Sequence, residues 1–245
     1  MNGWLNDRRA VRRVQRRPGV AFDAGAWPYR LAPVAQLLDH GLDLPAGVTF
    51  LVGENGSGKS TLVEAVAAAA GLNLEGGSRN AQHVTRGSES ALHDALQLVR
   101  SVGAPRWSYF LRAETMHGLY TYLEDLPPGG PPRTAFHELS HGESFLQVLR
   151  QHVNRPGFYV MDEPEAALSF TSCLGLVGVL DELARNGSQV LCATHSPLLT
   201  ALPGAAVLEL SSTGYAWTGW QDLALVDHWR RYLDDPRRYL RHVLE

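Results

Sequence analysis

Near-continuous apolar runs alternate with longer segments of helical periodicity through the middle of the chain. The runs at 48–52, 158–161 and 189–193 have the length and composition of strands buried on both faces of a sheet. A glycine-rich turn follows the first run, and a helix is predicted from Lys59 through the alanines up to Gly71. Strands that alternate with helices in this way predict an α/β fold with a mostly parallel sheet.

The segment between the first two runs has a less regular pattern. Ser90 is placed to cap a helix. Leu92, Leu96 and Val99 would lie on one face of that helix. We therefore expect 72–139 to form a partly helical insertion.

The C-terminal part is predicted to begin with a hairpin, because Ser212-Thr213-Gly214 is a turn sequence between two apolar segments. Helical segments follow it. We expect 205–245 to be a hairpin and helical tail of a single domain that spans 21–245, with 1–20 as a basic N-terminal arm.

The composition indicates the size class of the protein and its cellular compartment. A chain of 245 residues with 44% hydrophobic residues fits one globular domain. No apolar run approaches the roughly 18 residues of a membrane span, and no apolar block follows the basic start as in a secretory signal. The arginine-rich start resembles a mitochondrial transit peptide, but it lacks serine. Cys173 and Cys192 fall in apolar segments, so we expect buried, reduced thiols in a cytoplasmic protein.

The net charge of −3 favours no particular partner, but arginines are concentrated near the start of the chain. On a helix, their spacing of four residues would place them on one side. They would form either a solvated arm or a contact with nucleic acid or another anionic surface. The arginines concerned are Arg8, Arg9, Arg12, Arg13, Arg16 and Arg17.

The sequence 53–60, Gly-Glu-Asn-Gly-Ser-Gly-Lys-Ser, matches the phosphate-loop pattern G-x-x-x-x-G-K-S between a predicted strand and a predicted helix. In such a loop, backbone N–H groups and the helix N-terminus bind phosphate oxygens. Lys59, the only lysine of the chain, is expected to reach the β- and γ-phosphates, and Ser60 to bind Mg²⁺. The predicted nucleotide-binding residues are Gly53, Glu54, Asn55, Gly56, Ser57, Gly58, Lys59, Ser60 and Thr61.

Polar residues follow the other two buried runs. Asp162 and Glu163 end the run at 158–161, where Asp162 could hold Mg²⁺ and Glu163 could orient and polarise an attacking water. His195 follows the run at 189–193 and could donate a hydrogen bond to a γ-phosphate. We predict Glu163 and His195 as the catalytic residues.

The sequence His-Glu-Leu-Ser-His at 137–141 matches a zinc-protease signature. Ser140 and Glu143, however, form a capping box ahead of an apolar run, which places a helix N-terminus between the two histidines. A zinc protease needs both histidines on one continuous helix. We therefore interpret this helix start as an anion site.

Together these motifs resemble the ABC-type ATPase superfamily over residues of about 45–200. Gly53 to Thr61 matches the Walker A loop, and 158–163 matches Walker B. The residues after Walker B match the D-loop, and His195 matches the switch histidine. The signature motif corresponds to Ser140, His141, Gly142 and Glu143.

The resemblance implies a RecA-like P-loop NTPase core with a helical subdomain, and ATP and Mg²⁺ as cofactors. It also implies a homodimer on ATP binding, in which the signature residues contact the γ-phosphate in trans. His141 and Glu143 replace a glycine and the glutamine of transporter subunits. Such variants are similar to RecF, SMC and OLD-like heads, and to compact AAA-family ATPases with a serine-histidine-glycine-glutamate signature.

Some positions of the family pattern stay open. Gln82 and Glu114 both could be the Q-loop residue, and we favour Glu114 as a further Mg²⁺ ligand. Tyr29 or Trp27 could stack on adenine, although a packed ring is the simpler role for either.

The expected function is a soluble cytoplasmic ABC-type ATPase whose conformational cycle serves nucleic-acid maintenance or defence. About eighty residues separate Lys59 from Ser140, too few for a long coiled coil, so a partner would be nucleic acid or a separate protein. The alternative is the nucleotide-binding subunit of an ABC membrane transporter whose membrane spans lie on another chain.

Overall fold

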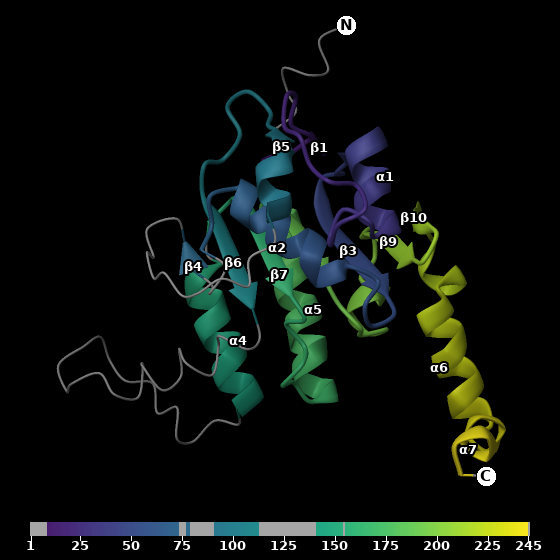
Figure 1. Cartoon of the computed structure of the whole chain (residues 1–245). Coiled ribbons are helices and arrows are strands. Elements are labelled where there is room, and N and C mark those ends of the chain that lie inside the picture. Colours follow the sequence, from purple (N-terminus) through teal and green to yellow (C-terminus); the bar gives the residue numbers. More distant parts are fainter. Residues whose placement is uncertain (1–8, 74–76, 79–90, 113–140, 154, 245) are drawn as a thin grey trace, which may run out of the picture.

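The computed structural model of the chain describes residues 9–73, 77–78, 91–112, 141–153 and 155–244 (Figure 1). In this part of the chain, a central sheet of seven strands is covered by helices on both faces. The predicted α/β fold with a mostly parallel sheet is confirmed.

The central sheet has parallel strands in its middle and antiparallel strands at both edges. In their order across the sheet, the strands are β10 (Gly214–Trp217), β9 (Ala206–Ser211), β3 (Gly47–Gly53), β8 (Gln189–Ala193), β7 (Phe158–Asp162), β6 (Ser108–Arg112) and β4 (Gly77–Ser78). The pairs from β9 to β7 and the pair β7–β6 are parallel, whereas β10 and β4 are antiparallel to their neighbours. The three strands predicted from the apolar runs are therefore neighbours, although more than a hundred residues separate the first from the second.

Both faces of the middle strands are buried, which explains their near-continuous apolar sequences. On β3, Leu51 packs into one hydrophobic cluster, and Phe50 and Val52 pack into the cluster on the other face. On β7, Val160 and Tyr159 divide between the two clusters in the same way. Side chains of a strand alternate between the faces of a sheet, so one strand contributes to both halves of the core.

The helices form one layer on each face of the sheet. The α-helices are α1 (Ala32–His40), α2 (Lys59–Ala69), α4 (His141–His152), α5 (Phe170–Arg185), α6 (Ala224–Asp234) and α7 (Arg237–Leu244), and the short 3₁₀ turns are η1 (Ala91–Ala95), η3 (Leu199–Ala201) and η4 (Trp220–Asp222). Helices α1 and α2 pack with the first cluster, and α4, α5 and the start of α6 pack with the second. Figure 1 shows α6 and α7 leading away from the sheet to the C-terminus.

A second sheet of three antiparallel strands contains the segment predicted as a basic arm. Its order is β2 (Leu42–Asp43), β1 (Arg13–Arg16) and β5 (Leu96–Val99). The arginines of β1 thus lie on an extended strand and not along one side of a helix. The division of the chain at 20/21 stays a prediction.

The prediction of a helix after Ser90 is wrong. Residues 91–95 form the single 3₁₀ turn η1, and β5 then pairs with β1, with Leu96 opposite Arg16. Leu92 and Leu96 are buried as expected, but their spacing of four residues fits a turn followed by a strand as well as a helix. The pairing with β1 decides between them. Strand β6, which also lies within 72–139, belongs to the central sheet.

The C-terminal hairpin lies where the turn sequence predicted it, with β9 and β10 paired around residues 212–213. The two cysteines are buried and have free thiols, as expected. Burial raises the pKa of the Cys192 thiol well above its ordinary value. None of the described helices is both long enough and apolar enough to cross a membrane.

The side chain of Gln189 joins the two sheets. Its Oε1 accepts a hydrogen bond from Val11 N at 2.9 Å. Its Nε2 donates to Val11 O at 2.8 Å and to Pro45 O at 2.9 Å. Gln189 is the first residue of β8 and is buried, and its two bonds to Val11 satisfy backbone groups that water does not reach.

We expect Gln189→Ala to lower the free energy of unfolding by about 2–4 kcal/mol, because three hydrogen bonds are lost and the Val11 backbone groups that made two of them stay buried. Urea denaturation of the two proteins measures the difference. Gln97→Ala is the matched control, since the Gln97 amide pairs with Gln15 on the exposed side of β5. The control should change stability by no more than about 0.5 kcal/mol. Equal losses for the two variants would contradict this role of Gln189.

Candidate nucleotide site

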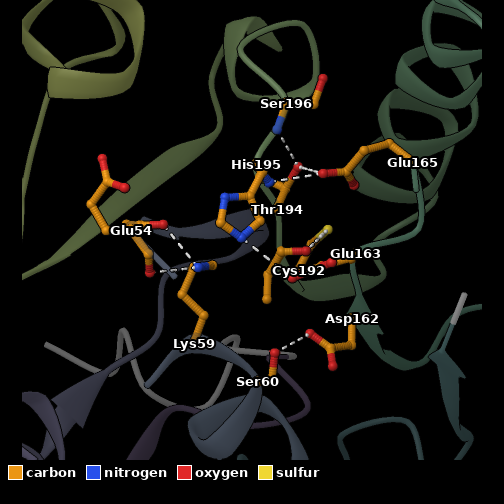
Figure 2. Close-up of polar contacts among 12 residues, drawn as sticks. Glu54, Lys59, Ser60, Asp162, Glu163, Glu165, Cys192, Thr194, His195 and Ser196 are labelled. Carbon is orange, nitrogen blue, oxygen red and sulfur yellow. Dashed lines mark hydrogen bonds and ion pairs between the residues drawn. The ribbon is translucent and has the colours of Figure 1, made fainter. Parts of the chain in front are cut away.

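The predicted site residues lie together at the carboxyl ends of three neighbouring strands in the middle of the sheet. Strands β3, β8 and β7 are parallel neighbours, and their carboxyl ends carry Gly53, Ala193 and Asp162. In the register, Asp162 lies opposite Ala193, which is two residues before His195. Ligands bind at the carboxyl ends of such strands in open α/β sheets. Figure 2 shows the side chains gathered there.

Two glycines make the phosphate loop possible. Gly58 is the N-cap of α2 and has a φ of 96°, a left-handed conformation that residues with a Cβ rarely adopt. At Gly53, a Cβ would collide with the carbonyl oxygen of Leu210 on the neighbouring strand β9. The loop therefore leaves β3 close to β9 and enters α2 with the backbone N–H groups of the helix start free for a ligand.

The ammonium group of Lys59 lies beneath this loop. Its Nζ donates to Gly53 O at 2.8 Å and to Glu54 O at 3.1 Å, and the residue is buried. Burial lowers the pKa of Lys59, and the charges of Glu163 and Asp162 oppose that shift. The lysine is thus a buried cation at the position where phosphate charge would be bound.

Asp162 and Ser60 face each other across the site. Ser60 Oγ donates to Asp162 Oδ1 at 3.1 Å. Burial raises the pKa of Asp162 to about 6, against the effect of the Ser60 hydrogen bond. Their oxygens are hard donors of the kind that Mg²⁺ prefers, and the buried carboxylate is costly to charge without a nearby cation.

Glu163 and His195 form a pair at the ends of β7 and β8. His195 Nε2 lies 3.3 Å from Glu163 Oε1, and both side chains remain partly exposed. Glu163 has a φ of 47°, the one left-handed non-glycine among the described residues. Its N–H donates to Ala193 O at 2.9 Å, which holds the turn. Such backbone strain gathers at functional sites, where the surrounding structure maintains it.

One residue of this site was not predicted. Glu165 Oε1 accepts hydrogen bonds from Thr194 Oγ1 at 2.6 Å and from His195 N at 2.8 Å (Figure 2). Burial raises the pKa of Glu165, and the hydrogen bond from Thr194 opposes the shift. Its position two residues after Glu163 was the available sequence signal. Its partner Thr194, however, lies 29 residues away, directly after β8.

A cavity of about 900 Å³ adjoins the phosphate loop. It is lined by the loop, His195, the N-terminal end of α1 and the β9–β10 hairpin. Tyr29 lies outside this lining and stacks on Phe22, with the ring centroids 4.6 Å apart. Its hydroxyl donates to Ala91 O, so Tyr29 is a packed ring, whereas Trp27 is 54% exposed.

Several predicted site residues fall outside the described residues. These are Ser140, Glu114, Gln82 and Arg8. His137, from the zinc-protease match that the capping box argues against, also lies outside them. Within the described residues, helix α4 covers His141–His152, and the helix start predicted at Ser140 lies outside them. Gly142 is buried against α5, since a Cβ there would collide with the side chain of Ser172. Among the residues that the structure does describe, no three His, Cys, Asp or Glu side chains are grouped so as to hold a metal ion by themselves.

Three of the five described arginines of the N-terminal cluster contact the protein itself. Arg9 donates to Leu44 O at 2.9 Å, and Arg13 forms an ion pair with Asp43 at 2.6 Å. The guanidinium of Arg16 lies 4.8 Å from the centroid of the Phe22 ring. Much of the predicted basic surface thus stabilises the second sheet and its connections.

The fold and the phosphate loop together define a P-loop NTPase. Two family models match the chain: one described as "AAA domain" at residues 35–101, and one described as "AAA domain, putative AbiEii toxin, Type IV TA system" at residues 118–201. The cytochrome c biogenesis ATP-binding export protein CcmA of Rhizobium etli is 32% identical over 187 residues, 68% of this chain and 81% of that protein.

Two further proteins illustrate the range of the similarity. The cell division ATP-binding protein FtsE of Haemophilus influenzae is 27% identical over 183 residues, 62% of this chain and 78% of FtsE. A nucleotide-free ATP-binding cassette from an ABC transporter is 18% identical, with a TM-score of 0.43 over 80% of this chain and 88% of that structure. The chain belongs to the family of ABC-type ATPases. The predicted ABC-type ATPase superfamily and the enzyme class are confirmed, whereas the similarity to RecF, SMC and OLD-like heads stays a prediction.

We expect Asp162→Asn to stabilise the nucleotide-free and Mg²⁺-free protein at pH 7 by about 2–3 kcal/mol. The folded-state pKa lies above the ordinary 3.8, so the folded wild type binds more protons than the unfolded chain between about pH 4 and 6. Its stability therefore falls as the pH rises through this window, whereas asparagine does not titrate. Urea denaturation at pH 4, 5, 6 and 7 checks this, and a stability difference that is independent of pH would contradict it.

Proposed function

We propose that the chain binds Mg-ATP at the edge of the sheet formed by β3, β8 and β7, and hydrolyses it there. The observation that carries the proposal is the convergence of Lys59, the Ser60–Asp162 pair and the Glu163–His195 pair beside one phosphate loop. Lys59 and the loop N–H groups, from Gly53 to Thr61, bind the phosphates. Glu163 and His195 act on the terminal phosphate.

Ser60 and Asp162 are the residues that would hold Mg²⁺. Bound there, Mg²⁺ would neutralise charge on the β- and γ-phosphates. Asp162 suits this role because its buried carboxylate gains most from a cation, and Ser60 because its hydroxyl already faces that carboxylate. Glu114 stays a proposed additional ligand.

In the proposed reaction, Glu163 accepts a hydrogen bond from the attacking water and orients it towards the γ-phosphorus. The water oxygen forms a bond to phosphorus, the bond to the β–γ bridging oxygen breaks, and ADP and phosphate leave. His195 donates a hydrogen bond to the γ-phosphate and faces Glu163 across the same space. The partial exposure of this pair leaves it open to water and to a second subunit.

ATP is proposed to hold two copies of the chain together. In this arrangement the start of α4 of one copy, with Ser140, His141, Gly142 and Glu143, contacts the γ-phosphate bound by the other. A helix N-terminus favours an anion, and the capping box of Ser140 and Glu143 predicts a helix start there. The family of the chain supports this arrangement.

The partner of the ATPase is proposed to be a membrane protein on another chain. CcmA is named as an export protein, and that relative matches over 81% of its length. The second candidate is a RecF, SMC or OLD-like head that serves nucleic-acid maintenance or defence. The description of the second family model, with its toxin and Type IV TA system, favours it. The internal contacts of Arg9, Arg13 and Arg16 weaken it.

We expect Glu163→Gln to slow ATP turnover about 10²- to 10³-fold and to keep ATP bound, because the phosphate loop is untouched. Light scattering on a sizing column should then show the mass doubling only with Mg-ATP. Lys59→Ala is the comparison variant and should lose ATP affinity. Normal turnover in Glu163→Gln would show that the catalytic assignment is wrong, and a mass that ignores bound ATP would contradict the dimer.

To separate the two partner classes, we expect DNA and RNA at low salt to leave ATP turnover within about twofold of its basal rate, because most arginine contacts are internal. Turnover with and without nucleic acid measures this. Arg17 is exposed and is the arginine best placed to respond. Stimulation by nucleic acid that is removed by salt and by Arg17→Ala would overturn the membrane partner in favour of the second candidate. Co-purification of one membrane protein in detergent, lost after Lys59→Ala, would support the membrane partner.

A further inference from the structure

Glu165 crosses from the end of β7 to the residues that follow β8. The backbone after β7 turns sharply, with Ala166 N donating to Glu163 O at 3.0 Å and Leu168 N donating to Glu165 O at 2.8 Å. This turn directs the Glu165 carboxylate towards Thr194 and His195 (Figure 2). One carboxylate oxygen, Oε1, accepts from both.

The hydrogen bonds around Thr194 have a defined direction. Thr194 Oγ1 accepts from Ser196 N at 3.0 Å, so its own proton is available for Glu165 Oε1 at 2.6 Å. The N–H of His195 donates to the same oxygen. Glu165 thereby fixes two consecutive residues, one through its side chain and one through its backbone. Thr194 is fully buried, so these bonds do not compete with bulk water.

This network fixes the backbone from which the His195 ring extends. The described contacts of His195 are a backbone bond to Glu165 and a ring contact with Glu163. Both partners belong to the same turn, 163–165. The turn is also tied to β8 by the bond from Glu163 N to Ala193 O. A catalytic group works best when its supporting contacts hold it within a fraction of an ångström.

We propose that Glu165 is a positioning residue for ATP hydrolysis, which holds the backbone of Thr194 and His195 so that the imidazole faces Glu163. This inference rests on the proposed function of the Glu163–His195 pair. The described side-chain hydrogen bonds of Glu165 go to Thr194 and His195, whereas Lys59 and Ser60 bond other groups. The effect of Glu165 therefore falls on turnover and not on ATP affinity.

Three substitutions separate positioning from other roles. Glu165→Ala removes both hydrogen bonds and should lower kcat roughly ten- to a hundredfold, with ATP affinity within about threefold of wild type. Glu165→Gln keeps an acceptor oxygen and should recover most of the lost turnover. Glu182→Ala is the matched control, since Glu182 is an exposed glutamate on α5. Thermal unfolding of each variant confirms that the proteins compared are folded.

A double-mutant cycle tests whether Glu165 acts through His195. If it does, Glu165→Ala should lower kcat by less than about threefold in a protein that already carries His195→Ala. Independent effects that multiply would overturn the inference and leave the ATPase assignment intact. A parallel loss of ATP affinity in Glu165→Ala would also overturn it, because the residue would then serve binding.

Hydrogen exchange gives a measurement that does not depend on turnover. In Glu165→Ala, the amides of His195 and Ser196 should exchange at least about tenfold faster than in wild type, and in Glu165→Gln and Glu182→Ala they should not. NMR resolves these amides individually. Unchanged protection in Glu165→Ala would show that the inference is wrong. If the wild-type protein hydrolyses no ATP while the variants show this exchange pattern, the proposed ATP hydrolysis is refuted, and Glu165 is shown only to hold the backbone of Thr194 and His195.

Discussion

The parallel pairing of β3, β8 and β7 is the constraint on which the rest of the structure depends. Because the three strands end at the same edge, a lysine, an aspartate and a histidine that are far apart in sequence lie within one site. Their charges then determine one another, since burial disfavours both the lysine cation and the aspartate anion. The site is organised for a highly charged ligand that compensates both.

The parts of the fold that could be predicted from sequence are those set by local pattern. The buried strands, the phosphate loop and the residues Asp162, Glu163 and His195 each follow from a short stretch with its own signal. The strand β5 could not be predicted, because the spacing of Leu92 and Leu96 fits two structures and the pairing with β1 selects one. Such pairings are tertiary effects that override local preference.

The same reason explains the missed side chains. The amide of Gln189 bonds the backbone of Val11, which is 178 residues away, and Glu165 bonds Thr194, which is 29 residues away. The position of Glu165 close to Glu163 marks it as a residue of the site, but neither sequence neighbourhood identifies the bonding partner, because the partners become neighbours only when the sheets form. Gln189 connects the central sheet to the segments beside the second sheet, and Glu165 connects the ends of β7 and β8. Both side chains are therefore cross-links between separate elements.

Because Lys59 is the only lysine of the chain, the nucleotide site can be modified selectively by amine chemistry. Reagents that modify amines, and enzymes that acylate lysine side chains, have a single side-chain target in these 245 residues. That target is buried and hydrogen-bonded beneath the phosphate loop. Its lowered pKa increases the share of neutral, nucleophilic amine, whereas its burial limits access. Acylation of Lys59 would therefore require the phosphate loop to move away from the side chain that it covers.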